Sequence, residues 1–203
     1  MTRKRIAILI SGRGSNMAAL IAAARDPNYP AEIAVVISNR PDAAGLAHAN
    51  RAGIATTIID HKAFGKDRTA FEAALGAKLS EQRIDLICLA GFMRLFTPQF
   101  VQEWDGRMLN VHPSLLPAFP GIDPHGQALR AGVKLSGATV HFVIPEMDAG
   151  PIIAQEAVPV EEGDTADALA ARVLAAEHRI YPLAVRLVAE GRVRVIEGRT
   201  RIA

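Results

Sequence analysis

Short apolar runs alternate with longer segments of helical spacing along the first half of the chain. The runs that read as buried strands are Ile6–Ile10, Ile33–Ser38, Ala55–Ile59 and Leu86–Ala90. Between them lie segments with apolar residues at helical spacing, of which the clearest are Asn16–Arg25 and Arg68–Gln82. Buried strands joined by helices are typical of a parallel sheet with both faces covered. The pattern therefore predicts an α/β fold with a Rossmann-like, mostly parallel sheet flanked by helices.

The pattern changes in the second half, where two strands follow each other without a helix between them. We expect these strands at Ala138–Ile144 and Ile152–Val160, paired antiparallel across the turn-rich segment Pro145–Pro151. A long helical pattern then covers Thr165–Glu190, and Val193–Ile196 has the pattern of an edge strand. The C-terminal half is thus predicted to add antiparallel strands to the sheet.

Length and composition are those of an ordinary globular domain. The 203 residues are 50% hydrophobic and 22% charged, which argues against disorder. Without repeats or linkers, we expect a single domain over residues 1–203, with halves at residues 1–100 and 101–203. The formal net charge is only +2, from 23 basic and 21 acidic residues. Because the basic residues are scattered, nucleic-acid binding is not indicated.

The single cysteine and the hydropathy pattern argue against a disulfide-bonded, secreted or membrane-spanning protein. Cys88 is the only cysteine and lies in an apolar run, so neither an intramolecular disulfide nor a cysteine-based zinc site is possible. The apolar run Ile6–Ile10 is too short for a signal peptide, and no stretch approaches the roughly 18 apolar residues of a membrane span. We therefore expect a cytoplasmic protein without membrane association.

A glycine-containing loop, Ser11–Asn16, follows the first predicted strand and leads into a helix. It satisfies only the first half of the dinucleotide-binding pattern, because Met17 replaces the third glycine. The second strand ends in Ser38–Arg40 rather than in the acidic residue that binds the ribose of NAD. No Gly-Lys-Ser/Thr sequence follows, so a nucleoside triphosphate loop is also disfavoured.

The loop still contains a glycine turn at a predicted helix N-terminus, which indicates a candidate anion-binding site. The amide groups and the positive end of the helix dipole favour an anion there. Gly14, Ser15 and Asn16 would suit a single phosphate. The alternative is a tight turn in which Ser15 or Asn16 simply caps the helix.

The segment Asn110–Gly121 holds prolines close to Asn110 and His112. Proline fixes φ and removes an N–H, so the segment is predicted to be a rigid loop. Arg107–Val111 reads as a short strand, which places both polar residues where the strand gives way to the loop. Ligands bind at such positions in α/β sheets. Alternatively, His112 only hydrogen-bonds the loop to the body of the protein.

A carboxylate, Asp148, lies in the connection between the two antiparallel strands. Asparagine can donate to a carbonyl oxygen that becomes an oxyanion, and histidine titrates near neutrality, with a usual pKa of about 6.5. A nearby carboxylate favours protonated histidine. Asn110, His112 and Asp148 could therefore stabilise a tetrahedral intermediate and move protons. There is no Gly-x-Ser-x-Gly motif, which favours direct transfer between two bound substrates.

Other histidines are weaker candidates for a site. His125 and His141 could be combined with His112 and Asp148 as metal ligands, but no His-x-x-x-His or His-Glu-x-x-His pair occurs. We therefore predict no metal. His141 alternates with apolar residues in a predicted strand and is interpreted as a structural histidine.

Six motifs together resemble the phosphoribosylglycinamide formyltransferase family of folate-dependent enzymes. They are ISGRGSN, LAGFMRLF, MLNVHPSLLPAFPG, GATVHFV, EMDAGPII and EHRIYP, which span residues 10 to 182 in the family's order. The Asn-x-His-Pro-Ser-Leu-Leu-Pro core is shared with other 10-formyltetrahydrofolate enzymes, and the Gly-Ser-Asn loop favours the glycinamide ribonucleotide branch. The resemblance implies formyl transfer from 10-formyltetrahydrofolate to the amine of phosphoribosylglycinamide, in purine biosynthesis.

The resemblance also implies roles for individual residues. The catalytic residues would be Asn110, His112 and Asp148. The phosphate would be held by Gly14, Ser15 and Asn16, and the ribose by Glu177. The folate pocket would be lined by Arg68, Met93, Arg94, Leu95, Phe96, Asn110, Ile144, Pro145, Glu146 and Met147. As an alternative, Met93 and Leu95 could be core residues. The chain departs from the family pattern at Pro145 and at Pro124–Gly126, which concerns the folate loop more than the chemistry.

Partners are then expected to be small molecules, with neither nucleic acid nor membrane, and the protein is expected to be a monomer or a homodimer. Two other formyl-group enzymes remain alternatives, methionyl-tRNA formyltransferase and formyltetrahydrofolate hydrolase. We expect neither, because each normally carries an additional domain that 203 residues do not accommodate. A regulatory nucleotide-binding module without chemistry is an alternative of a different class.

Overall fold

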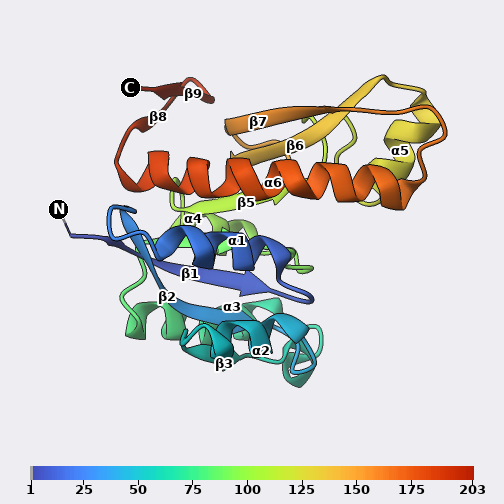
Figure 1. The fold of residues 1–203 in the computed structure, drawn as a ribbon. Helices are drawn as coiled ribbons and strands as arrows, with labels where there is room; N and C mark the ends of the chain where they lie inside the picture. Colours follow the sequence, from blue (N-terminus) through green and yellow to red (C-terminus); the bar gives the residue numbers. More distant parts are fainter. Residues whose placement is uncertain (1) are drawn as a thin grey trace. The chain divides into compact units, whose positions relative to one another are not determined.

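The structure is a computed structural model that describes residues 2–203, and its chain divides into two compact units (Figure 1). The first unit ends at Leu109 and the second begins at Asn110. The expectation of a single domain with halves at residues 1–100 and 101–203 stays a prediction.

The predicted α/β fold class is confirmed. Seven strands have the hydrogen-bonded order β3-β2-β1-β4-β5-β6-β7, and a separate pair has the order β8-β9. Strand β5 spans Met108–His112 and therefore runs through the boundary between the units. None of the helices in residues 2–203 combines the length and the apolarity needed to cross a membrane.

The first unit is built on parallel strands whose side chains are largely buried. Its strands are β1 Lys4–Ile10, β2 Ala31–Ser38, β3 Thr56–Ile58 and β4 Leu86–Leu89. Strand β1 pairs in parallel with both β2 and β4, and β2 pairs in parallel with β3. All four side chains of β4 are buried, which explains its unbroken apolar sequence.

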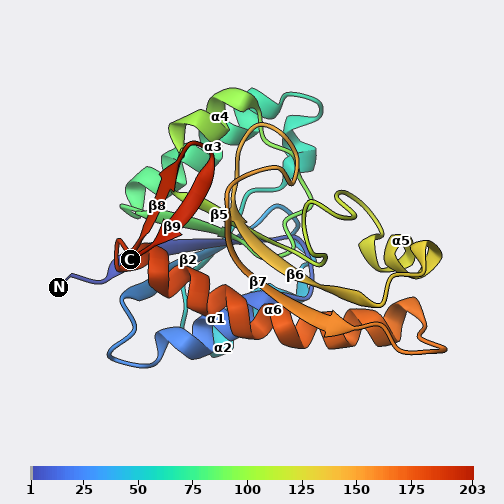
Figure 2. The ribbon, with the colours of Figure 1, turned by 90° about the horizontal axis from the view of Figure 1, so that it is seen from above.

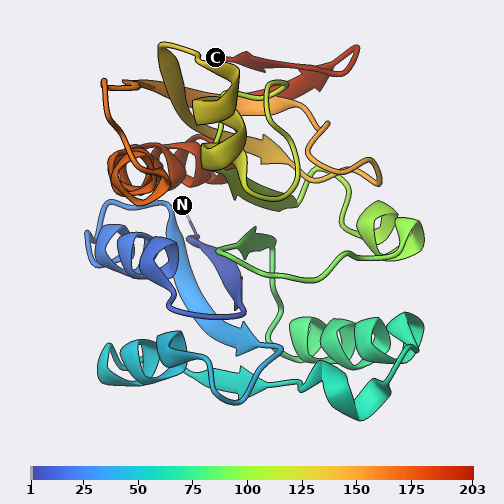
Figure 3. The same ribbon diagram turned by 90° about the vertical axis from the view of Figure 1, so that its right-hand side faces the viewer.

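Helices cover both faces of these parallel strands. They are α1 Ser15–Ala24, α2 Ala44–Arg51, α3 Arg68–Glu81 and α4 Pro98–Glu103, with a 3-10 turn η1 at His61–Phe64. Figure 3 shows α1 and α2 on one face and α3 and α4 on the other. The loops after the neighbouring strands β1 and β4 therefore lead to opposite faces.

The second unit pairs two antiparallel strands and packs a long helix against them. Strand β6, Leu135–Phe142, pairs antiparallel with β7, Ile152–Pro159, as predicted. Helix α6, Ala166–Ala189, begins after the N-cap Thr165 and packs against both strands (Figure 2). The shorter helix α5 covers Pro124–Ala131.

The prediction that Val193–Ile196 adds an edge strand is wrong in its pairing. This strand, β8, pairs antiparallel only with β9, Arg199–Ile202, in a separate two-stranded sheet. The connecting residues Glu197 and Gly198 both have positive φ, at 50° and 72°. Such a turn reverses the chain at once, which is typical of a tight hairpin.

Candidate active site

Two of the three predicted catalytic residues lie on one face of β5. Side chains alternate along a strand, so Asn110 and His112, two residues apart, point to the same side. His112 Nδ1 lies 3.5 Å from Asp148 Oδ2, and the two side chains are only 7% and 10% exposed. The structure thus brings His112 and Asp148 together in a nearly buried pair.

The turn after β6 holds Asp148 in a fixed place. Its φ is 54°, a left-handed conformation that is uncommon outside glycine. The amide of Gly121 donates to Asp148 Oδ2 at 2.8 Å, so the proline loop and this turn are joined at the carboxylate. This bond fixes the direction in which the carboxylate points.

The proline loop holds the other side of the His112 ring. His112 Nε2 lies 2.9 Å from the carbonyl oxygen of Phe119. Because a carbonyl can only accept, Nε2 carries a hydrogen and donates it. A neutral ring would then have no hydrogen on Nδ1 to offer to Asp148, whereas a protonated ring donates from both nitrogens.

His141, interpreted from the sequence as a structural histidine, belongs to the same cluster. Its Nε2 lies 3.3 Å from Asn110 Nδ2 and 3.9 Å from Asp148 Oδ1. Its Nδ1 lies 2.8 Å from the carbonyl oxygen of Phe142, so Nδ1 carries the hydrogen of the neutral ring. Nε2 is then an acceptor, and it fixes the amide nitrogen of Asn110 on its own side. The available signal was a histidine in a strand in which every residue after Leu135 is buried.

Burial keeps the His141 ring neutral. It lowers the pKa of His141, and the nearby His112 lowers it further, while the bond to the Phe142 carbonyl and the charge of Asp148 act in the opposite direction. Burial also lowers the pKa values of His125 and His178. The His141 ring is therefore suited to accept a hydrogen bond at Nε2.

The lowered pKa of His141 should make folding depend on pH. In the native state the ring resists protonation, whereas in the unfolded chain it takes a proton near its usual pKa of about 6.5. The unfolded state therefore binds more protons below that pH, and stability should fall as the pH is lowered from 7 to 5. We expect His141→Asn to flatten this dependence by up to about 1.4 kcal/mol per pH unit. Urea unfolding at several pH values measures it, and an unchanged slope would contradict the expectation.

The predicted phosphate loop lies in the first unit, and the helix there begins at Ser15. Its N-cap is Gly14, with φ 75° and no side-chain hydrogen bond to the cap. The alternative, in which Ser15 or Asn16 caps the helix, is therefore wrong. The first amides of an α-helix lack acceptors within the helix, and this start has no side-chain cap to accept from them. The local backbone thus retains the character of an anion site.

Gly45, at the start of α2, packs directly against this loop, a contact that no pattern in the sequence indicates. Its amide donates to the carbonyl oxygen of Gly12 at 3.0 Å. A Cβ on Gly45 would lie 2.7 Å from Ile10 Cδ1 and 3.1 Å from Gly12 O. Only glycine fits this approach without displacing the loop.

The predicted folate residues are divided between the units. In the first unit, Met93 and Leu95 are 80% and 60% exposed, so the alternative that they are core residues is wrong. Phe96 stacks between Phe92 and Phe100, with centroid distances of 5.4 and 4.8 Å. The remaining members are exposed or intermediate, and they are Arg68, Arg94 and, in the second unit, Ile144, Pro145, Glu146 and Met147.

Glu177, predicted to bind the ribose, lies on α6 in the second unit and is 6% exposed. A carboxylate that is so deeply buried is seldom without a function or a partner. Within residues 2–203, no group of three or more His, Cys, Asp or Glu side chains is arranged to hold a metal ion.

The α/β fold carries Asn110 and His141 beside the nearly buried pair of His112 and Asp148. A family described as formyl transferase matches residues 4–185 of the chain. The chain therefore belongs to the formyl transferase family.

Individual relatives show which members of the family the chain is similar to. The chain is 45% identical over 193 residues to phosphoribosylglycinamide formyltransferase of Escherichia coli (strain K12), covering 95% of this chain and 91% of that protein. It is 54% identical over 196 residues to the human trifunctional purine biosynthetic protein adenosine-3, covering 97% of this chain but 19% of that protein. The chain thus spans about a fifth of the human relative.

A solved structure agrees with these sequence relationships. The crystal structure of glycinamide ribonucleotide transformylase 1 from Symbiobacterium toebii has a TM-score of 0.95 and 52% sequence identity. The similarity covers 98% of this chain and 94% of that one. The fold of the present chain is therefore similar to that structure over almost its whole length.

Proposed function

We propose that this chain transfers the formyl group of 10-formyltetrahydrofolate to the amine of 5'-phosphoribosylglycinamide, giving the N-formyl product and tetrahydrofolate in de novo purine biosynthesis. The observation that carries the proposal is the buried pair of His112 and Asp148 beside Asn110 and His141, in a chain of the formyl transferase family. The high identity to a full-length phosphoribosylglycinamide formyltransferase supports this substrate.

Asn110 would stabilise the oxyanion. When the amine attacks the formyl carbon, negative charge grows on the formyl oxygen, and an amide donor in a site shielded from water stabilises it. One hydrogen of Asn110 Nδ2 points to His141 Nε2, which leaves the second for the substrate. His141 would thus orient the amide without taking part in proton transfer.

His112 and Asp148 would carry out the proton transfers. Protonated His112 would add a second donor for the oxyanion, once its Nε2 releases the Phe119 carbonyl. Phe119 has φ 56°, a sparsely populated conformation for a large residue that such a change could relieve. Asp148 would hold His112 charged and take the amine proton, directly or through water, and this proton would pass to the departing nitrogen of tetrahydrofolate as its bond to the formyl carbon breaks.

The two substrates would be held by the remaining predicted residues. The start of α1, at Gly14, Ser15 and Asn16, would bind the phosphate, and Glu177 would bind the ribose. The exposed apolar residues Met93, Leu95 and Met147 would be covered by folate, while backbone groups nearby recognise the pteridine. Arg68, Arg94, Phe96, Ile144, Pro145 and Glu146 would complete the pocket.

Incubation with phosphoribosylglycinamide and 10-formyltetrahydrofolate tests the proposal directly. We expect tetrahydrofolate to form only when both substrates are present, and to form equally after exhaustive chelation, since the proposed site uses no metal. Release of tetrahydrofolate without the amine substrate would indicate a hydrolase instead. A protein that binds nucleotides and ignores folate would be a regulatory module. The proposal includes small-molecule partners, a cytoplasmic location, and a monomer or homodimer.

Gly14→Val should weaken binding of phosphoribosylglycinamide at least about tenfold, because the phosphate loses charge-assisted bonds to a displaced backbone. A Cβ on Gly14 would lie 3.0 Å from Met17 Cε and 3.1 Å from Gly45 Cα, at φ 75°. Gly53→Val is the matched control, because Gly53 has the same φ of 75° but nothing within 4 Å of its Cβ position. Folate affinity should persist in both variants. If titration shows both affinities of Gly14→Val falling equally, the loop is only structural.

A further inference from the structure

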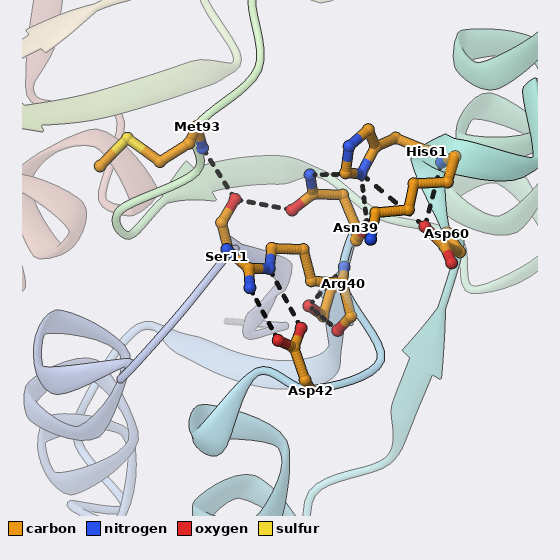
Figure 4. Close-up of polar contacts among 9 residues, drawn as sticks. Ser11, Asn39, Arg40, Asp42, Asp60, His61 and Met93 are labelled. Carbon is orange, nitrogen blue, oxygen red and sulfur yellow. Dashed lines mark hydrogen bonds and ion pairs between the residues drawn. The ribbon is translucent and has the colours of Figure 1, made fainter. Parts of the chain in front are cut away.

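A buried serine joins two loops at the carboxyl end of the parallel strands in the first unit. Ser11, directly after β1, is 5% exposed. Its amide donates to the carbonyl oxygen of Gly91 at 3.2 Å, and the amide of Met93 donates to Ser11 Oγ at 2.8 Å. Figure 4 shows the hydroxyl between Met93 and Asn39. Residues 91–93, just after β4, are thus held at two points by one residue.

These loops flank the place where the strand order reverses. Strand β1 lies next to β4 and is followed in sequence by β2 on its other side. The loop after β1 leads to α1 on one face, and the loop after β4 leads to α4 on the other (Figure 3). Open α/β sheets bind their ligands in the crevice between such diverging loops. Ser11 therefore lies at the place in the sheet where α/β folds commonly bind ligands.

The directions of the hydrogen bonds can be assigned from chemistry. The Met93 amide can only donate, so Ser11 Oγ accepts from it and has its own hydrogen left to place. Asn39 Oδ1 lies 2.6 Å away and accepts that hydrogen. Asn39 is 2% exposed, and its amide nitrogen lies 3.2 Å from His61 Nδ1, on η1. The hydroxyl of Ser11 thus has one orientation, which Asn39 fixes.

We propose that Ser11 is a positioning residue for the folate-binding segment Met93–Phe96, with Asn39 as the residue that orients it. This inference rests on the proposed function, which assigns folate to that segment. Holding the Met93 amide keeps the backbone in one conformation before the ligand arrives, and preorganisation of this kind improves affinity. Loss of the Ser11 hydroxyl should therefore affect folate binding while leaving the phosphate-binding residues Gly14, Ser15 and Asn16 in place.

The test compares Ser11→Ala with a matched control, Ser38→Ala. Ser38 also lies at the carboxyl end of a strand and is fully buried, but its hydroxyl bonds only Arg40, donating to the carbonyl and accepting from the amide at 2.7 and 3.0 Å. For Ser11→Ala we expect KM for folate to rise about three- to tenfold, the effect of one hydrogen bond, with kcat and KM for the amine substrate within about twofold. Ser38→Ala should keep both KM values.

Hydrogen exchange gives a readout that does not involve folate. The Met93 amide should exchange faster in Ser11→Ala than in the wild type or in Ser38→Ala, because it loses its acceptor. Asn39→Asp, which keeps an acceptor for the Ser11 hydroxyl, should remain closer to the wild type in folate KM than Asn39→Ala. If Ser11→Ala does not fold, Ser11→Cys supplies the same comparison with a weaker acceptor.

Three results would overturn the inference. They are unchanged Met93 exchange in Ser11→Ala, an equal rise of folate KM in Ser11→Ala and Ser38→Ala, and a folate KM that Ser11→Ala leaves unchanged. Failure of the proposed function is distinct, because the wild-type protein would then form no tetrahydrofolate. Wild-type turnover with a folate KM unaffected by Ser11→Ala would refute only the role of Ser11.

Discussion

Asp148→Asn is expected to slow formyl transfer at least about 100-fold, the lower end for loss of a general acid–base group. Asparagine can still accept the hydrogen bond that Gly121 donates to Asp148 Oδ2. The substitution therefore removes the charge beside His112 and leaves the local fold supported. Ligand affinities should change much less than turnover, which steady-state kinetics will separate.

Asp123→Asn is the matched control in the same unit. Asp123 caps α5 by accepting from the amide of Gly126 at 3.1 Å, and asparagine caps helices equally well. Its turnover should stay within about twofold of the wild type.

His112→Ala should be about as slow as Asp148→Asn. The double variant should lose much less activity than the product of the two effects, since the two residues act as a unit. Near-normal turnover in either folded single variant would refute the assignment.

Gly150→Ala should have the second large effect, although residue 150 has no chemical group to offer. A Cβ there would lie 1.8 Å from the carbonyl oxygen of Phe142 and 2.9 Å from its carbon. Because these are backbone atoms of β6, the turn must move instead, and it would carry Asp148 with it. A displacement of about 1 Å can cost roughly 100-fold in rate, and overpacking costs about 1–3 kcal/mol of stability.

Gly76→Ala provides the comparison for Gly150→Ala. In α3, a Cβ on Gly76 would meet only Phe100 Cε2, at 4.0 Å. Alanine is the better helix former, so this variant should be as stable as the wild type or up to about 1 kcal/mol more stable. Thermal unfolding and kcat should be measured on both variants. Wild-type turnover in Gly150→Ala would show that the turn tolerates movement without harm to the site.

The strands of the parallel sheet were predictable because buried strands leave an unbroken apolar signature, as in Leu86–Leu89. Helix α2, Ala44–Arg51, was not named because it is short and follows the turn-rich segment Arg40–Asp42. The partner of β8 was missed because Arg199–Ile202 is mostly exposed and carries no apolar alternation. Such elements depend on tertiary contacts more than on their own pattern.

The candidate site also contains some residues that the sequence could identify and one that it could not. Asn110, His112 and Asp148 could be named from residue type and from position beside a strand end or a tight turn. The place of His141 could not, because its role depends on the neutral tautomer fixed by Phe142 and on a contact with Asn110 across 31 positions in sequence. Periodicity assigns a residue to a strand face but does not say which side chain stands opposite.

The C-terminal hairpin of β8 and β9 limits the addition of further strands to the edge of the seven-stranded sheet. Strand β7 ends the strand order, and an edge strand offers backbone groups that can recruit another chain. Strand β9 packs against β7, and the Thr200 hydroxyl donates to the carbonyl oxygen of Ile152, where β7 begins. Further along the strand, Glu156 pairs with Arg179 of α6 and places charge beside the edge. The hairpin therefore shortens the stretch of β7 on which a second chain could add a strand and start aggregation.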